Sequence, residues 1–277
     1  MQKMTRVVLA VLAVAGTTAA MAQSSVTLYG RVNTTVERQK VGDVSTTGLF
    51  NNSSRFGFKG TEDLGGGLKA GFQLESGFNS DTGAAASTFF GRQSEVNLSG
   101  NFGMVRLGNF FAESYYATAD YVSLHNHNTG SSSDAFYAYV MHDANKIAYR
   151  TPDLGGLTED AAVALHEQTV GGKNAFDLAA NYNMGPLALG AGYSTQGAVN
   201  QFAVRALYTF GSFVVGGYIQ RDEDAYMVNG GKRNTFRLAG AYNLGASEFH
   251  LNVGRAGEYK NRNDSDATQW TLGYNYN

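Results

Sequence analysis

Apolar and polar residues alternate one by one on both sides of a glycine-rich turn in the first third of the chain. The stretch RFGFKGTEDLGGGLKAGFQLESGF covers residues 55–78, and the residues between its apolar ones include Arg55, Lys59, Gln73 and Glu75. A period of two predicts β-strands rather than helices. One face of this hairpin is apolar and the other is charged, so the location of the hydrophobic core becomes the question that constrains the fold.

The same two-faced pattern recurs along the chain. Phe236, Leu238 and Tyr242 alternate with polar or small residues such as Arg237. Counting the alternating runs predicts fourteen strands, with boundaries uncertain by a few residues. Their ranges are 25–40, 54–62, 68–79, 90–99, 104–112, 144–152, 157–170, 175–184, 187–196, 201–210, 213–225, 234–244, 248–259 and 268–277.

The connections between these runs alternate in length. Short turns fall at positions such as 63–67, 185–186 and 245–247, whereas longer polar connectors lie between them, the longest at 113–143. Short turns on one side and long loops on the other are typical of an outer-membrane barrel. The sequence therefore predicts an all-β fold, a transmembrane antiparallel up-and-down β-barrel.

A soluble β-sandwich is the alternative, because its strands alternate as well. Charged residues are only 16% of the chain, against roughly 25% in soluble domains, while the chain has 35 glycines and 12% aromatic residues. Aromatic residues gather at strand ends, for example Tyr182, Tyr208, Tyr242 and Tyr276, where they would form interface girdles. In a barrel the apolar row faces lipid, and the polar row faces water inside.

Residues 1–22 have the composition of a cleaved signal peptide. Lys3 and Arg6 precede an apolar run, and Ala20-Met21-Ala22 supplies small residues before a cleavage site. Removing these residues changes 21 basic side chains to 19 against 23 acidic ones, which leaves a net charge of −4. Such a chain lacks the basic face of a nucleic-acid binder, and because it contains no cysteine, disulfides are excluded.

Several of these stretches resemble one family closely. QSSVTLYG at residues 23–30, the hairpin described above and Arg92-Gln93 are similar to the general porins of β-proteobacteria, of the Neisseria, Bordetella and Comamonas type. The resemblance implies that residues 23–277 form a porin barrel, which has sixteen strands in the family and about fourteen recognisable ones here, assembled as a homotrimer in outer-membrane lipid and lipopolysaccharide. It also implies a passive channel for ions and small hydrophilic solutes, narrowed by an inward-folded third loop at about 113–143.

The end of the chain departs from that pattern. Family members end in a strand whose last residue is usually Phe, whereas residues 270–277 here read WTLGYNYN and resemble the fourteenth strand. We expect that the last hairpin is missing, and a barrel closed by fourteen strands is the alternative.

The candidate pore-lining residues are arginines on the strands and acids on the long loop. Arg31, Arg55, Arg106 and Arg150 fall on the polar side of their strands, whereas Arg92 falls on the apolar side and is placed in the lumen by the resemblance alone. Glu113 and Asp120 begin the long loop and would face those arginines. Arginines lining a pore favour anions, which predicts a mild anion preference. The alternative, that they only neutralise neighbouring carboxylates, stays open.

Other constellations favour no second activity. His125 and His127 lack a third metal ligand, and the acidic stretch 222–224 lacks calcium-loop spacing, so solvated charge is expected there and neither metal nor cofactor is predicted. Ser53, Ser54 and His142 have no catalytic signature around them, and the protein is not predicted to be an enzyme. An outer-membrane lipase or protease, a surface adhesin and a non-conducting fragment remain alternatives.

Overall fold

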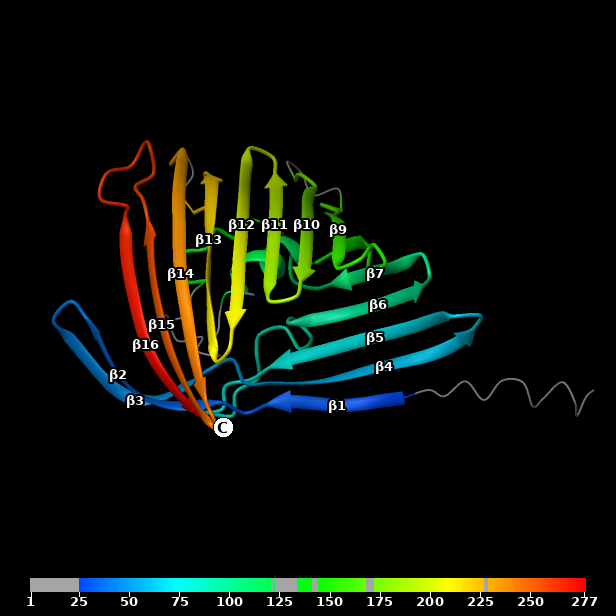
Figure 1. The fold of residues 1–277 in the computed structure, drawn as a ribbon, viewed down its shortest axis with the longest axis horizontal. Coiled ribbons are helices and arrows are strands. Elements are labelled where there is room, and N and C mark those ends of the chain that lie inside the picture. Colours follow the sequence, from blue (N-terminus) through cyan, green and yellow to red (C-terminus); the bar gives the residue numbers. More distant parts are fainter. Residues whose placement is uncertain (1–24, 121, 123–133, 141–143, 168–171, 227–228) are drawn as a thin grey trace, which may run out of the picture.

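The computed structural model describes residues 25–120, 122, 134–140, 144–167, 172–226 and 229–277. Fourteen strands form one sheet in which every strand pairs with its neighbours in chain order, apart from the hairpin β2–β3 (Figure 1). The strands are β1 (Ser25–Arg31), β4 (Arg55–Gly65), β5 (Leu68–Gly77), β6 (Gln93–Gly100), β7 (Gly103–Asn109), β8 (Lys146–Arg150), β9 (Leu157–Ala164), β10 (Ala175–Met184), β11 (Leu187–Gln196), β12 (Val199–Phe210), β13 (Phe213–Glu223), β14 (Lys232–Leu244), β15 (Ser247–Ala256) and β16 (Ala267–Tyr276).

All pairings in this sheet are antiparallel, as an up-and-down topology requires. The main sheet thus has fourteen strands in the predicted order, and the β2–β3 hairpin, which was not predicted, brings the strands among the described residues to sixteen. The sheet curves, with β1 and β16 as its two edges, and the registers among the described residues contain no pairing of β1 with β16 (Figure 1). No helix in the described part of the chain is long and apolar enough to cross a membrane.

The first predicted strand, 25–40, is wrong in its extent. β1 stops at Arg31, and the chain then forms a separate hairpin of β2 (Thr34–Val41) and β3 (Val44–Asn51) that projects away from the main sheet (Figure 1). Its two-residue turn is Gly42-Asp43, and Gly42 has a φ of 59°, a left-handed conformation that glycine adopts without steric cost. The predicted connector 41–53 is thus mostly strand.

Strand registers divide the side chains between two faces. Arg55, Lys59, Gln73 and Glu75 share one face, because Lys59 lies opposite Gln73 and Gly57 lies opposite Glu75. This face, called the inner face below, also carries the helical segment of the long loop. The outer face carries large apolar side chains that remain exposed, for example Leu28 (68%), Leu178 (52%) and Leu251 (52%). An apolar exposed surface of this extent fits a hydrocarbon environment and not water.

Aromatic rings form a continuous row on the outer face at the end of the sheet where the short turns lie. Phe210, Phe213, Tyr242, Phe249 and Tyr274 come from five successive strands, and neighbouring ring centroids are 4.6–6.4 Å apart. The predicted gathering of aromatic residues at strand ends is thus found in this row. Tyrosine and phenylalanine rings prefer the interface between hydrocarbon and water, so the row is typical of a membrane girdle.

The hydrophobic core lies between the inner face and the long loop. Ala119, Val122 and Tyr137 of the loop pack against Ala203, Leu207 and Tyr218 of β12 and β13. The chain therefore buries apolar surface mainly where the loop covers the wall, and not between two sheets. This arrangement answers the question that the alternating hairpin raised.

Candidate functional site

Three arginines gather around one glutamate on the inner face near the start of the chain. The Nε atom of Arg92 lies 2.6 Å from Oε1 of Glu75, and Nε of Arg55 lies 3.6 Å from Oε2. Arg31 is directly opposite Arg55 in the pairing of β1 with β4, and it lies within electrostatic reach of both Arg55 and Arg92. We call Arg31, Arg55, Arg92 and Glu75 the arginine cluster.

The arginine cluster carries an excess of positive charge. Arg55 and Arg92 share the Glu75 carboxylate, Arg31 adds a third positive charge opposite Arg55, and like charges placed opposite each other in a sheet repel. Arg31 donates from Nη2 to the carbonyl of Asn52 at 3.1 Å, whereas its buried Nε has no hydrogen-bond partner among the described residues. The cluster therefore keeps hydrogen-bonding and charge capacity for an anion.

Arg92 reaches this face from the preceding connection and not from a strand. β6 begins at Gln93, one residue after Arg92. The alternation of faces along a strand, which assigned Arg92 to the apolar side, therefore does not apply to Arg92. The predicted start of that strand at residue 90 is wrong. The side chain folds inward to Glu75, and its guanidinium lies 5.9 Å from the ring centroid of Phe111.

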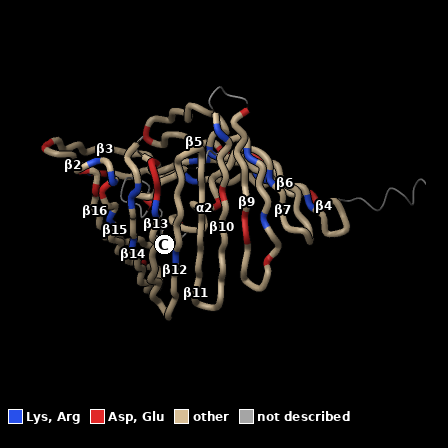
Figure 2. The backbone as a smooth tube through the Cα atoms, turned by 90° about the horizontal axis from the view of Figure 1, so that it is seen from above, with Lys and Arg blue, Asp and Glu red and all other residues tan. Residues whose placement is uncertain are grey.

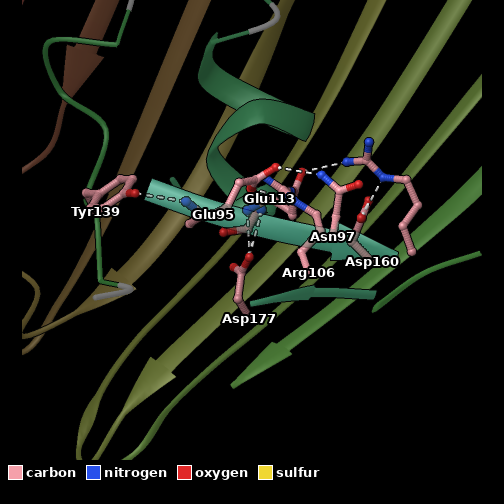
Figure 3. Close-up of polar contacts among 10 residues, drawn as sticks. Glu95, Asn97, Arg106, Glu113, Tyr139, Asp160 and Asp177 are labelled. Atoms are coloured by element: carbon pink, nitrogen blue, oxygen red, sulfur yellow. Dashed lines mark hydrogen bonds and ion pairs between the residues drawn. The ribbon is translucent and has the colours of Figure 1, made fainter. Parts of the chain in front are cut away.

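Arg106 and Arg150 are also on the inner face, but their charges are neutralised. Figure 2 marks the basic and acidic positions along the chain, and Figure 3 shows Arg106 among its acidic neighbours. Arg106 bonds Glu113 and lies 2.6 Å from Glu95, while Arg150 lies 2.7 Å from both Glu113 and Asp160. Burial raises the pKa of Glu113, and the two arginines oppose that rise. Two cations face three carboxylates here, so these arginines hold the loop to the wall.

The helical start of the long loop is fixed to the wall by a carboxylate. α2 (Glu113–Tyr115) continues into the single-turn π-helix η1 (Tyr116–Asp120). The Oδ2 atom of Asp177 on β10 accepts hydrogen bonds from the backbone N–H groups of Glu113 (2.7 Å) and Ser114 (3.1 Å). A negative charge at a helix start satisfies its unpaired donors. Figure 3 shows Asp177 directed at this turn.

Small residues on β11 let the loop backbone approach closely. A Cβ atom on Gly192 would lie 2.6 Å from Cβ of Ser114, and one on Gly190 would overlap the carbonyl oxygen of Ala117. That same carbonyl accepts a hydrogen bond of 2.7 Å from Nε of Arg205 on β12. The loop therefore lies directly on the wall.

The returning part of the loop, residues 134–140, is held in the same way. Gln220 on β13 accepts from the N–H of Ala138 at 2.8 Å and donates to its carbonyl at 3.1 Å. The hydroxyl of Tyr226 donates to the carbonyl of Tyr137, and Tyr139 accepts from the N–H of Ala112 at 2.9 Å. Both described ends of the loop are thus anchored to several strands.

The loop presents aromatic rings and a carboxylate on the side of the arginine cluster. Phe111, Tyr115 and Tyr116 pack with centroid separations of 5.7–6.4 Å. Tyr115 donates to Asp134 at 2.5 Å and lies 3.4 Å from Asp120. Burial and the neighbouring Asp134 raise the pKa of the Asp120 carboxyl, while the Tyr115 hydrogen bond and Arg55 oppose that rise.

The predicted site residues thus fall into two groups. Arg31, Arg55 and Arg92 belong to the arginine cluster, and Asp120 lies within electrostatic reach of Arg55. Arg106 and Arg150 both bond Glu113 at the base of the loop. The sequence interpretation missed the side chains that anchor the loop, Asp177, Ser194, Arg205 and Gln220. Alternation along their strands places them on the polar face, but their loop partners lie more than 60 residues away in the sequence.

One expectation about acidic residues is wrong, and others lie outside the described residues. Asp222 is 1% exposed and accepts a 2.5 Å hydrogen bond from Tyr259, so it is not a solvated loop charge. The Ser54 hydroxyl donates to the carbonyl of Asn33 at 3.1 Å. His125, His127 and His142 lie outside the described residues, as does the predicted signal peptide.

A curved sheet with an apolar outer face, a charged inner face and a loop packed inside defines the class of outer-membrane channel barrels. Comparison with known families agrees, since residues 8–277 match the family model described as Gram-negative porin. The chain belongs to the Gram-negative porins, a family of passive outer-membrane channels.

Individual relatives give the same result. The chain is 34% identical to outer membrane porin protein 32 of Delftia acidovorans, over 99% of this chain and 85% of the relative. A porin of Bordetella pertussis is 36% identical over 50% of this chain and 42% of its own length. Among solved structures, the anion-selective porin from Comamonas acidovorans matches with a TM-score of 0.77 and 33% identity, covering 91% of this chain and 83% of that one. Salmonella typhi OmpF, at 16% identity and a TM-score of 0.71, shares the fold.

Proposed function

We propose that this chain forms a water-filled channel for passive diffusion of ions and small hydrophilic solutes, with a mild preference for anions. The observation that carries the proposal is the arginine cluster, in which Arg55 and Arg92 pair with Glu75 and Arg31 lies opposite Arg55 without a carboxylate of its own among the ion pairs of the described residues. Positive charge in a narrow passage with low-dielectric walls raises the local anion concentration and lowers their entry barrier. The solved relative described as anion-selective supports the same sign.

The proposal assigns the loop at about 113–143 the role of narrowing the passage. Its described ends lie on the inner face and bring Asp120 and Tyr116 towards the arginine cluster. Residues 1–22 are proposed to be a cleaved export signal, and the barrels are proposed to assemble as homotrimers in lipid that includes lipopolysaccharide. The mechanism is sieving by width and charge, with no covalent step and no cofactor.

Planar-bilayer recordings of the refolded protein test this function. In a KCl gradient we expect a reversal potential of the sign for chloride preference, and stepwise openings in threes. Glu75→Gln removes the carboxylate that offsets the three arginines. At about 10 Å in water one charge is worth about 0.4 kcal/mol to each ion, with opposite sign for chloride and potassium. The two effects add to about 0.8 kcal/mol, so the chloride-to-potassium permeability ratio should rise about fourfold.

Glu159→Gln is the matched control, because it makes the same charge change on the outer face of the sheet. Glu159 is exposed and lies on the same face of β9 as Ala161. The substitution should leave the permeability ratio unchanged. A cation-selective reversal potential in the unsubstituted protein would end the anion proposal, and absence of conductance in correctly folded protein would end the channel proposal.

A further inference from the structure

The loop carries an aromatic surface that the anchoring of the loop does not use. Tyr116 is 38% exposed, and within the described part of the chain no hydrogen bond of its hydroxyl is recorded. Its ring packs against Phe111 at 5.9 Å in an edge-to-face arrangement and against Tyr115 at 5.7 Å. A tyrosine held by its neighbours but open on one side can accept another ring.

This aromatic surface lies beside the cationic part of the arginine cluster. Arg92 stacks over Phe111 with its guanidinium 5.9 Å from the ring centroid, and Tyr116 lies within electrostatic reach of both Arg92 and Glu75. Asp120 at the end of the same helical turn lies within reach of Arg55. Glu75 and Asp120 offset two of the three arginine charges, and the Asp134 carboxylate accepts a hydrogen bond from the Tyr115 hydroxyl.

We propose that the arginine cluster and the Phe111–Tyr116 surface together form a binding subsite for aromatic carboxylates in the passage, an inference that rests on the proposed channel function. A carboxylate accepts paired hydrogen bonds from a guanidinium group, and the cluster presents three guanidinium groups with one carboxylate, Glu75, among them. The ring attached to that carboxylate then meets the exposed ring of Tyr116. Small inorganic anions use only the first half of this subsite.

The ring contact predicts discrimination between solutes of equal charge and similar size. Aromatic pairs gain about 0.5–1.5 kcal/mol beyond the area that they bury, which corresponds to about a two- to tenfold difference in binding. Benzoate should therefore occupy the channel about two- to tenfold more strongly than cyclohexanecarboxylate, because both present one carboxylate on a six-membered ring and only benzoate has a π-system. Acetate should bind more weakly than either.

Block of the chloride current in planar bilayers measures this binding. Sodium benzoate and sodium cyclohexanecarboxylate are titrated separately against the open channel, and the half-blocking concentrations are compared. We expect the benzoate advantage in the unsubstituted protein, its retention in Tyr116→Phe and its loss in Tyr116→Leu. The control Tyr193→Leu removes an exposed tyrosine of the outer face and should retain the advantage.

The outcomes separate this inference from the proposed function. If the channel conducts chloride but benzoate and cyclohexanecarboxylate block it equally, the aromatic subsite is wrong and the channel stands. If Tyr116→Leu keeps the full benzoate advantage while migrating as a folded species on an unheated gel, the assignment to Tyr116 is overturned. If correctly folded protein does not conduct, both proposals fail together.

Discussion

At the scale of single residues, the arginines of the inner face differ in what surrounds them and not in their type. Arg106 pairs with Glu95 and Glu113, so its charge is neutralised and it holds the loop to the wall. Arg55 and Arg92 share only Glu75, and Arg31 lies opposite Arg55. Counting arginines along polar strand faces therefore overestimates the number available to a passing anion; of the five arginines predicted to line the pore, the three around Glu75 remain.

Asp120 gives the anion preference a dependence on pH. Its pKa is raised by burial and by Asp134, so it binds a proton at a higher pH than an ordinary aspartate, whose pKa is about 3.9. Protonation removes a negative charge near Arg55. As the pH falls from about 7, we expect the chloride preference to rise before ordinary aspartates titrate, measured as a shift in reversal potential in a KCl gradient.

Substitution isolates the group that titrates. Asp120→Asn should show at neutral pH the stronger chloride preference that the unsubstituted channel reaches in acid, and should lose most of the pH response. Asp264→Asn changes an exposed aspartate in the connection between β15 and β16, and the reversal potential of this variant should depend on pH as in the unsubstituted protein. An unaltered pH response in Asp120→Asn would show that another group carries the effect and would overturn this assignment.

At the scale of elements, the position of the loop depends on two glycines of β11, Gly190 and Gly192, which leave room for the loop backbone. A Cβ atom on Gly192 would lie 2.6 Å from Cβ and 2.8 Å from Cα of Ser114, so Gly192→Val must push α2 away from the wall. Overpacking of this kind costs about 1–3 kcal/mol. We expect a lower unfolding temperature on heat-modifiability gels and a noisier single-channel current, because the displaced loop samples several positions.

Gly240→Ala is the matched control for that substitution. Gly240 also lies within a strand, but the nearest atom to an added Cβ there is 3.6 Å away, an ordinary contact distance. Its stability and current should match those of the unsubstituted protein. Equal noise and equal stability in Gly192→Val and Gly240→Ala would contradict the view that close backbone approach positions the loop.

The strands could be predicted from the sequence because their signal is local. Alternation with a period of two assigns Phe58 and Lys59 to opposite faces whatever the rest of the chain does. The hairpin β2–β3 was missed because alternation continues through residues 25–40 and conceals the end of β1 at Arg31. Asp177 could not be assigned its role, since its partners Glu113 and Ser114 lie 64 and 63 residues away. Parity predicts the face, but contacts across the passage depend on the assembled sheet.

At the scale of the whole molecule, the two faces of the sheet should tolerate charge differently. Thr27 and Leu28 are neighbours on β1, and both are exposed, so in water an arginine at either position would cost little. In a bilayer they differ, because Leu28 is on the outer face and Thr27 shares the inner face with Lys59. An arginine facing hydrocarbon near the bilayer midplane costs about 2–4 kcal/mol.

Urea titrations of protein folded in phospholipid vesicles measure this difference. Leu28→Arg should lower the free energy of unfolding by about 2–4 kcal/mol, and Thr27→Arg should change it by less than about 1 kcal/mol, because the new guanidinium stays in water. Leu28→Ala separates the loss of apolar contact from the cost of the charge. Equal stability of the two arginine variants would mean that both faces of the sheet meet the same solvent. That result would contradict a barrel whose outer face meets lipid and whose inner face lines an aqueous passage.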